Sequence, residues 1–403
     1  MVVTCEIQFE NNPEGCYFGG QVMTGKIVLS ADKVKQVKAV VLKIRGFAHT
    51  SWSEKTNDKT THYSGHIDYI NSVTYLLSPK SSDESLFIEP GIHSFNFACH
   101  IPLNCPSSFE GLRGHIRYIV QVNMERPWKF DQTFSRGFTV LKILNLNYDT
   151  PLLKLPANSE MTKVFCCGPM KSDPLQMHVQ LSQTGYVPGQ LIPVTILVHN
   201  NTKVQITEVC LRLVMMVCVY SQNPRCKATS ENRTISKLIG DPVPVLCNKQ
   251  FTYLLPVPAT PPTCFNLCSI VQVGYRIEVA AKMKGVFYTN QEIHVPVTIG
   301  NVPLMDVVQQ QPMATRANML SAPEEEVAVL ETNNLPWSDN ENIPCPTFEA
   351  SGFMPQAEIA DPNQHDYGET NFSPKYPVFN IPSPTIEEIT SNKNADANKS
   401  TWL

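Results

Sequence analysis

Residues 1–303 consist of short β-branched and aromatic runs separated by Pro, Gly and Asn. The run from Val37 to Arg45 places Val40, Leu42 and Ile44 on one face, which is the two-residue period of a half-buried strand. No stretch has a long helical period with caps at both ends. Many short strands at close spacing therefore predict an all-β chain of the sandwich type. Further runs of this kind are His115 to Val122, Leu191 to Val198, Glu208 to Val219, Gln250 to Val257, Val273 to Ala280 and Gln291 to Ile299.

The same landmarks occur twice in the same order, which predicts two copies of one sandwich, offset by about 160 residues. Gly19-Gly20-Gln21-Val22 leads into a strand in the first half, and Pro188-Gly189-Gln190-Leu191 does so in the second. We expect a sandwich at 1–150, a linker at 151–174 where Pro, Gly and Asn cluster, and a second sandwich at 175–304. The other matching pairs are Phe95-Asn96-Phe97 with Phe251-Thr252-Tyr253, Ile101-Pro102 with Val257-Pro258, Pro106-Ser107-Ser108-Phe109 with Pro261-Pro262-Thr263-Cys264-Phe265, and Arg117-Tyr118-Ile119 with Tyr275-Arg276-Ile277.

Charge separates the last hundred residues from the rest. Residues 305–403 carry 4 Lys and Arg against 15 Asp and Glu, a balance of −11, whereas residues 1–304 carry 28 against 21, a balance of +7. The last segment also has scattered prolines and no alternation, so we expect an acidic disordered tail over 305–403. A basic body is suited to contact with anionic surfaces, although segregated charge can also simply keep the tail solvated.

The sequence indicates a soluble chain inside the cell. Its N-terminal residues have no basic segment followed by a long apolar run, so we expect no signal peptide. The longest apolar stretch, Val209 to Tyr220, contains Arg212 and is too short to span a membrane. We therefore expect a cytoplasmic protein whose 13 cysteines remain thiols.

No catalytic arrangement is recognisable, and we expect neither an enzyme nor a bound cofactor or metal. Phosphate-binding Gly-rich loops, zinc-protease motifs, hydrolase nucleophile motifs and kinase-like catalytic loops do not occur in the sequence. The histidines have no carboxylate at a triad-like spacing, and no cysteine pairs have the spacing of zinc ligands. We also expect no nucleic-acid partner.

Several short motifs together resemble the arrestin domain-containing proteins, the α-arrestins. The central one is Pro106-Ser107-Ser108-Phe109-Glu110-Gly111, followed by Gly114-His115-Ile116-Arg117-Tyr118, and Gly185-Tyr186-Val187-Pro188-Gly189 opens the second half. The resemblance covers about residues 5–304 and implies two tandem immunoglobulin-like β-sandwiches, the arrestin fold. Phe109, an apolar residue inside a turn, is expected to pin that turn to the core. Other matching segments are Arg126-Pro127-Trp128, Leu146-Asn147, Cys166-Cys167, Pro296-Val297-Thr298-Ile299-Gly300 and Pro303-Leu304.

The resemblance implies a cytosolic adaptor that binds the cytoplasmic regions of membrane receptors or transporters. Such an adaptor would direct their endocytosis, sorting or ubiquitin-linked turnover, and would associate with the plasma membrane and endosomes only peripherally. The alternative is a ubiquitin-independent scaffold that sorts cargo on endosomes. An extracellular immunoglobulin-like receptor is disfavoured, because the sequence has neither a signal peptide nor the Cys-Trp-Cys spacing of such domains.

The expected link to ubiquitin departs from the family pattern. Many members recruit HECT-type ubiquitin ligases through Pro-Pro-x-Tyr motifs in the tail, which bind the aromatic groove of a WW domain. This sequence has no such motif, and the nearest segment is Ser373-Pro374-Lys375-Tyr376. If a ligase is recruited directly, Pro374 and Tyr376 should carry the binding. The serine in place of the first proline removes a stacked contact, so we expect that binding to be weak.

Overall fold

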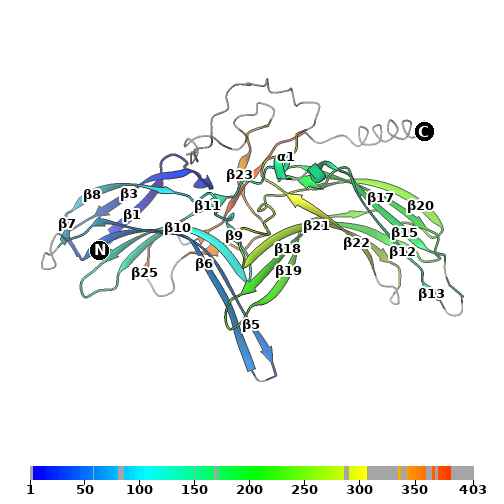
Figure 1. Ribbon diagram of the computed structural model, residues 1–403, viewed down its shortest axis with the longest axis horizontal. Coiled ribbons are helices and arrows are strands. Elements are labelled where there is room, and N and C mark those ends of the chain that lie inside the picture. The colour runs from blue at the N-terminus through cyan, green and yellow to red at the C-terminus, as the bar shows by residue number, and fades with distance from the viewer. Residues whose placement is uncertain are drawn as a thin grey trace, which may run out of the picture.

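Figure 1 shows the computed structural model, in which two β-sandwiches lie side by side. Nearly all described secondary structure is strand, so the predicted all-β fold with two sandwiches is confirmed. The short helices α1 (Leu146–Asp149) and η1 (Pro151–Lys154) lie where one sandwich passes into the next. The structure describes residues 3–57, 59–79, 86–149, 151–167, 170–171, 173–285, 290–305, 335, 337, 343–359, 365–367 and 371–382.

The first sandwich packs two mainly antiparallel sheets against each other. One sheet has the strand order β1-β3-β8, and the other has the order β2-β11-β10-β5-β6, with β9 paired to β10. β5 and β6 form a long hairpin that projects beyond the sandwich (Figure 1). The strands are β1 (Val3–Phe9), β2 (Cys16–Phe18), β3 (Val22–Ala31), β4 (Lys35–Val37), β5 (Ala39–Thr56), β6 (Lys59–Leu77), β7 (Leu86–Ile88), β8 (Gly91–His100), β9 (Phe109–Glu110), β10 (Gly114–Glu125) and β11 (Gln132–Leu141).

The second sandwich has the same construction. A four-stranded sheet of order β12-β15-β17-β20 lies against a five-stranded sheet of order β16-β22-β21-β18-β19. No helix in the described parts of the chain is long and apolar enough to cross a membrane. The strands are β12 (Ala157–Lys163), β13 (Cys166–Cys167), β14 (Met170–Lys171), β15 (Leu175–Leu181), β16 (Gly185–Tyr186), β17 (Leu191–Asn200), β18 (Ile206–Ser221), β19 (Lys227–Gly240), β20 (Cys247–Pro256), β21 (Val271–Met283) and β22 (Gln291–Ile299).

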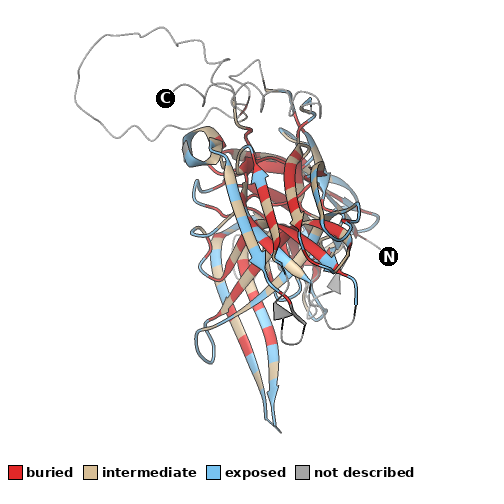
Figure 2. Ribbon diagram, turned by 90° about the vertical axis from the view of Figure 1, so that its right-hand side faces the viewer, coloured by how far each residue is buried: buried red, intermediate tan, exposed pale blue. Residues whose placement is uncertain are grey.

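Alternation along each strand decides which side chains form the core. In β10, Ile116, Tyr118 and Val120 belong to the buried core, and each is at most 3% exposed. Because successive side chains of a strand point to opposite faces, His115 and Arg117 lie on the outer face of the same sheet. Figure 2 shows the same pattern: buried residues fill the sandwiches, whereas exposed and buried residues alternate along the projecting hairpin.

The duplication is repeated in backbone hydrogen bonds. Gly20 N donates to Ile101 O over 2.8 Å in the first sandwich, and Gly189 N donates to Val257 O over 2.8 Å in the second. The two glycines have φ angles of 93° and 94°, a left-handed conformation that residues with a Cβ avoid. Each is preceded by a short strand in parallel pairing, β2 with β11 and β16 with β22. The repeated landmarks therefore correspond to one turn used twice.

The second sandwich begins earlier than residue 175. β12, which lies inside the expected linker at 151–174, pairs along its whole length with β15 and forms the edge of the four-stranded sheet. Its side chains are half-buried or exposed. An edge strand has a neighbour on one side only, so the sequence Ala-Asn-Ser-Glu-Met-Thr-Lys shows no clear apolar alternation.

Short strands also occur within residues 305–403, where an extended tail is expected. β23 (Thr347–Ala350) pairs with β27 (Lys375–Val378), and β24 (Ala357–Glu358) pairs with β26 (Asn371–Phe372). β25 (His365–Asp366) adds in parallel to β11 of the first sandwich. The described segments of residues 305–403 therefore form strands that pair with one another and with the first sandwich, unlike the extended tail that was expected. Most of the expected tail lies outside the described residues.

Candidate functional site

The signature loop, residues 106–111, leads into β10, and its two serines fasten it to β11 and the residue after it. Ser108 N donates to Val140 O over 2.8 Å, and Val140 N donates back to Ser108 Oγ over 3.0 Å. Ser107 Oγ accepts a hydrogen bond from Lys142 N over 2.9 Å. Both serines are buried, so these bonds satisfy polar groups that water does not reach. The serines thereby fix the position of the loop.

Phe109 and Tyr118 anchor the same loop to the core. Phe109 is 1% exposed, so the predicted buried anchor is confirmed. Its ring lies so near Gly111 that a Cβ there would come within 2.8 Å of it, which explains the glycine. The Tyr118 hydroxyl donates to Pro106 O over 2.7 Å. Burial raises the pKa of Tyr118 well above its ordinary value, so the phenol remains a neutral donor.

Glu110, which is buried, and Arg117, which is partly exposed, form an ion pair beside the loop. Arg117 Nε and Nη2 donate to the two carboxylate oxygens of Glu110 over 2.8 and 2.9 Å. Burial raises the pKa of Glu110 above its ordinary value, while the Arg117 charge acts in the opposite direction. Loss of Arg117 would leave the buried charge of Glu110 uncompensated. Arg117 Nη1 also donates to Glu358 O over 3.1 Å, which connects the ion pair to the C-terminal segment.

The structure brings the signature loop and the predicted WW ligand together. Residues 371–382, here called the junction strap, cross the contact between the two sandwiches. Tyr376 in the strap is 0% exposed, and its hydroxyl donates to Ser108 O over 2.9 Å. Pro374 is buried as well, so neither residue is accessible to a WW domain in this conformation. The hydrophobic cluster around Tyr376 consists of Phe18, Leu141, Leu146, Val187, Val302, Trp337, Tyr376 and Phe379.

The junction strap is bonded to both sandwiches. On the first, Lys375 N donates to Thr139 Oγ1 over 3.1 Å, and on the second, Phe379 N donates to Pro188 O over 2.9 Å. A Cβ on Gly189 would come within 2.1 Å of Phe379 O. Gly189, which the sequence places in the segment that opens the second half, therefore also makes room for the strap. Bonds on both sides stabilise one relative position of the two sandwiches.

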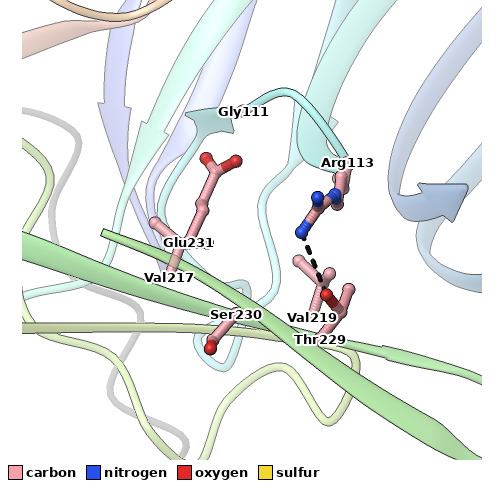
Figure 3. A pocket seen from close by; sticks show the side chains of 8 residues that line it. Gly111, Arg113, Val217, Val219, Thr229, Ser230 and Glu231 are labelled. Atoms are coloured by element: carbon pink, nitrogen blue, oxygen red, sulfur yellow. Dashed lines mark hydrogen bonds between the residues drawn. The ribbon is translucent and has the colours of Figure 1, made fainter. Parts of the chain in front are cut away.

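The sandwiches also touch directly, away from the strap. Thr50 Oγ1 in the projecting hairpin donates to Tyr220 O over 2.8 Å. Figure 3 shows a second contact, in which Arg113 Nη1 donates to Thr229 Oγ1 over 2.9 Å. The crevice around Arg113 is closed too tightly to hold a small ligand. Its walls are formed by Gly111, Arg113, Gly114, Val217, Val219, Thr229, Ser230 and Glu231.

One group on the second sandwich has the spacing of metal ligands. Among the described residues, Glu278, Glu292 and His294 place one ligand atom each within 4.8 Å of the others. Arg212 already bonds Glu278 over 2.8 Å and Glu292 over 3.0 Å, and Arg276 bonds Glu278 over 2.6 Å. Two guanidinium groups neutralise these carboxylates, so the group forms a salt-bridge network across the sheet face.

Three histidines that look isolated in the sequence form a row on the first sandwich. His66 of β6 lies opposite His49 of β5, which lies opposite His115 of β10. The neighbouring ring centres are 5.9 and 5.6 Å apart. Burial and the nearby positive charge of Arg117 lower the pKa of His115 to about 3. Sequence spacing did not reveal this row, because it depends on how strands far apart in the chain are paired.

Comparison with known proteins identifies both sandwiches. The family model of the arrestin (S-antigen) N-terminal domain matches residues 5–147, and that of the arrestin C-terminal domain matches residues 171–304. The chain belongs to the α-arrestin family. It is similar to arrestin domain-containing protein 17 of Caenorhabditis elegans, with 26% identity over 93% of this chain and 98% of that protein. Human arrestin domain-containing protein 4 is 24% identical over a region that covers 73% of this chain and 70% of that protein.

Family membership confirms the resemblance that the motifs carry. Arrestin domain-containing protein 15 of Caenorhabditis elegans is a further relative, 27% identical over 72% of this chain and 78% of its own. Arrestin family proteins are in general adaptors that bind other proteins. In this α-arrestin the signature loop lies at the junction between the two domains. There the carbonyl oxygen of Ser108 accepts the hydrogen bond from Tyr376 of the junction strap.

Proposed function

We propose that this α-arrestin is a cytoplasmic adaptor that binds the cytoplasmic regions of membrane receptors or transporters. It directs their endocytosis, sorting or ubiquitin-linked turnover, with recruitment to the plasma membrane and endosomes. The observation that supports this most is the junction, where the signature loop, the hairpin and the strap hold two arrestin domains as one body. Such a body presents the outer faces of two sheets together, which suits an extended protein partner better than a small molecule.

The proposal is tested by measuring membrane proteins at the cell surface. Cells that lack the protein, and the same cells expressing it again, are compared by surface biotinylation and quantitative mass spectrometry. We expect a defined set of receptors or transporters to accumulate without the protein and to return to their former level with it. The same set should be cross-linked to the re-expressed protein. If every membrane protein has the same surface level with and without the protein, the proposed adaptor function is contradicted.

The second candidate, a ubiquitin-independent sorting scaffold, is favoured by the burial of Pro374 and Tyr376. A WW domain needs both side chains exposed in a polyproline conformation. In the described structure the Tyr376 hydroxyl is instead bonded to the signature loop. Direct ligase recruitment through this motif therefore competes with the packing of the strap.

Peptide titration against an isolated WW domain separates the two candidates. A peptide of residues 371–382 should bind with a dissociation constant poorer than about 100 μM, which is roughly 5.5 kcal/mol of affinity. Ser373→Pro should tighten that binding, because it adds a ring contact and favours the extended conformation. Tyr376→Ala should abolish it. Binding that responds to neither substitution would remove the ligase role and leave the scaffold.

A further inference from the structure

The turn between β10 and β11, residues 126–131, carries two large apolar side chains into solvent. Trp128 is 101% exposed, and Phe130 is 77% exposed. Single exposed apolar residues are ordinary on protein surfaces. Two exposed aromatic rings on one tight turn, with Trp128 fully exposed, are less common than single exposed residues. We call this turn the aromatic tip.

Hydrogen bonds hold the aromatic tip in this shape against the strain of its backbone. Trp128 has a φ of 61°, in the left-handed region that bulky residues rarely adopt. Arg126 N donates to Asp131 Oδ1 over 3.1 Å, and Arg126 Nε donates to Phe130 O over 2.8 Å. These bonds close the turn on itself from its first residue to its last. Strain that the surrounding structure maintains is a reason to look for a function of the exposed ring.

Two exposed lysines lie at the aromatic tip, alongside one exposed aspartate. Lys129 lies between the two aromatic residues and is exposed. Lys38, also exposed, lies at the base of the tip, because its backbone nitrogen donates to Glu125 O over 2.7 Å. The carboxylate of Asp131 accepts a hydrogen bond from the backbone nitrogen of Arg126. Aromatic rings combined with lysine and arginine are the composition of sites that lie in the headgroup layer of a membrane.

We propose that the aromatic tip inserts into the interface of an anionic membrane and attaches the first domain to it. Trp128 and Phe130 would enter the boundary between headgroups and acyl chains, and Lys129 and Lys38 would remain at the anionic headgroups. A protruding turn of two rings fits a fluid bilayer, which closes around it. A protein partner would instead need a pocket shaped for both rings. This inference does not depend on cargo, because lipid alone is the partner.

Vesicle binding by the full-length protein tests the inference. Phosphatidylcholine vesicles with and without phosphatidylserine are mixed with the wild type and variants, and the bound fraction is measured by co-flotation. We expect the wild type to bind when phosphatidylserine is present. The double variant Trp128→Gln/Phe130→Gln should lower the partition coefficient at least tenfold. Lys129→Glu should weaken binding only to the anionic vesicles.

Tyr148→Gln is the matched control, because Tyr148 is also a strongly exposed aromatic residue, at 85%, but lies in α1 at the domain junction. This variant should bind vesicles as the wild type does. Circular dichroism melting checks that each variant stays folded. Brominated lipids, which quench tryptophan that enters the bilayer, give a second measurement. We expect quenching of the wild type and its loss in Trp128→Phe, which keeps an aromatic ring for binding.

Three results would overturn the inference. They are a folded double variant that binds anionic vesicles as tightly as the wild type, a wild type that does not bind them, and equal quenching in Trp128→Phe. Because the vesicles contain no protein, each of these results leaves the adaptor proposal standing. A failed cargo experiment likewise leaves the vesicle result standing.

Discussion

Replacing Tyr376 with alanine tests how the junction strap is held. The side chain is 0% exposed and donates a hydrogen bond to Ser108 O over 2.9 Å. Truncating a fully buried aromatic residue costs about 3–5 kcal/mol, a figure that includes the lost hydrogen bond of about 1 kcal/mol. Each domain keeps its own core without the strap, so the loss should appear as undocking of the strap. Amide exchange in the strap should then speed up by about two to three and a half orders of magnitude.

Hydrogen exchange followed by mass spectrometry measures this directly. The informative peptide covers residues 371–382, since the amides of Lys375 and Phe379 donate bonds to the two domains. Tyr376→Phe, which keeps the ring and loses the hydroxyl, should speed exchange by about tenfold or less. Tyr367→Ala is the control, because that tyrosine is 52% exposed, and exchange of the strap should stay unchanged. Wild-type exchange rates in Tyr376→Ala would refute the strap as the structure describes it.

Three further changes probe the same region. Phe109→Ala should lower the free energy of unfolding by about 3–5 kcal/mol in chemical denaturation, and an unchanged midpoint would contradict the buried anchor. Gly189→Ala should speed exchange of the strap, because its Cβ would overlap Phe379 O; exchange at the wild-type rate would contradict this. The pKa of His115 is lowered from 6.5 to about 3, so between these values the unfolded state binds more protons. The free energy of unfolding should therefore fall as the pH drops below 6.5, by about 1–2 kcal/mol near pH 5. In urea denaturation at several pH values, His115→Gln should reduce this dependence of the unfolding free energy on pH.

The fold was predictable where strands are buried on one face. The first part of β10 shows this, since Ile116 and Tyr118 lie in the core and alternate with the polar residues His115 and Arg117. The duplication of the sandwich was predictable because the same residue types make the same hydrogen bonds in both copies. Tyr118 donates to Pro106 O, and its counterpart Tyr275 donates to Pro261 O over 2.6 Å. Strand β12 was not predictable, because an edge position leaves its side chains half-buried and removes the apolar period.

The position of the junction strap could not be read from the sequence for a different reason. Tyr376 lies in a segment rich in proline with no alternation, which is the composition of a solvated tail. Its burial depends on partners more than 200 residues earlier in the chain, such as Ser108, with which its hydroxyl bonds at a separation of 268 residues. No local pattern reports contacts of that separation. The signature loop was recognised as a motif, but its role as the acceptor for the strap depends on the tertiary fold.

Packing in the junction and the proposed binding to a WW domain are therefore incompatible uses of Tyr376. A WW domain must take Tyr376 from the junction, so the free energy of strap docking subtracts from the affinity of the motif. Docking favourable by at least about 3 kcal/mol would weaken an intrinsic dissociation constant near 100 μM by roughly a hundredfold or more, to about 10 mM or weaker. At that affinity the intact protein does not recruit a ligase through these residues alone. Recruitment through Pro374 and Tyr376 therefore requires an event that releases the strap, whereas sorting without ubiquitin requires none.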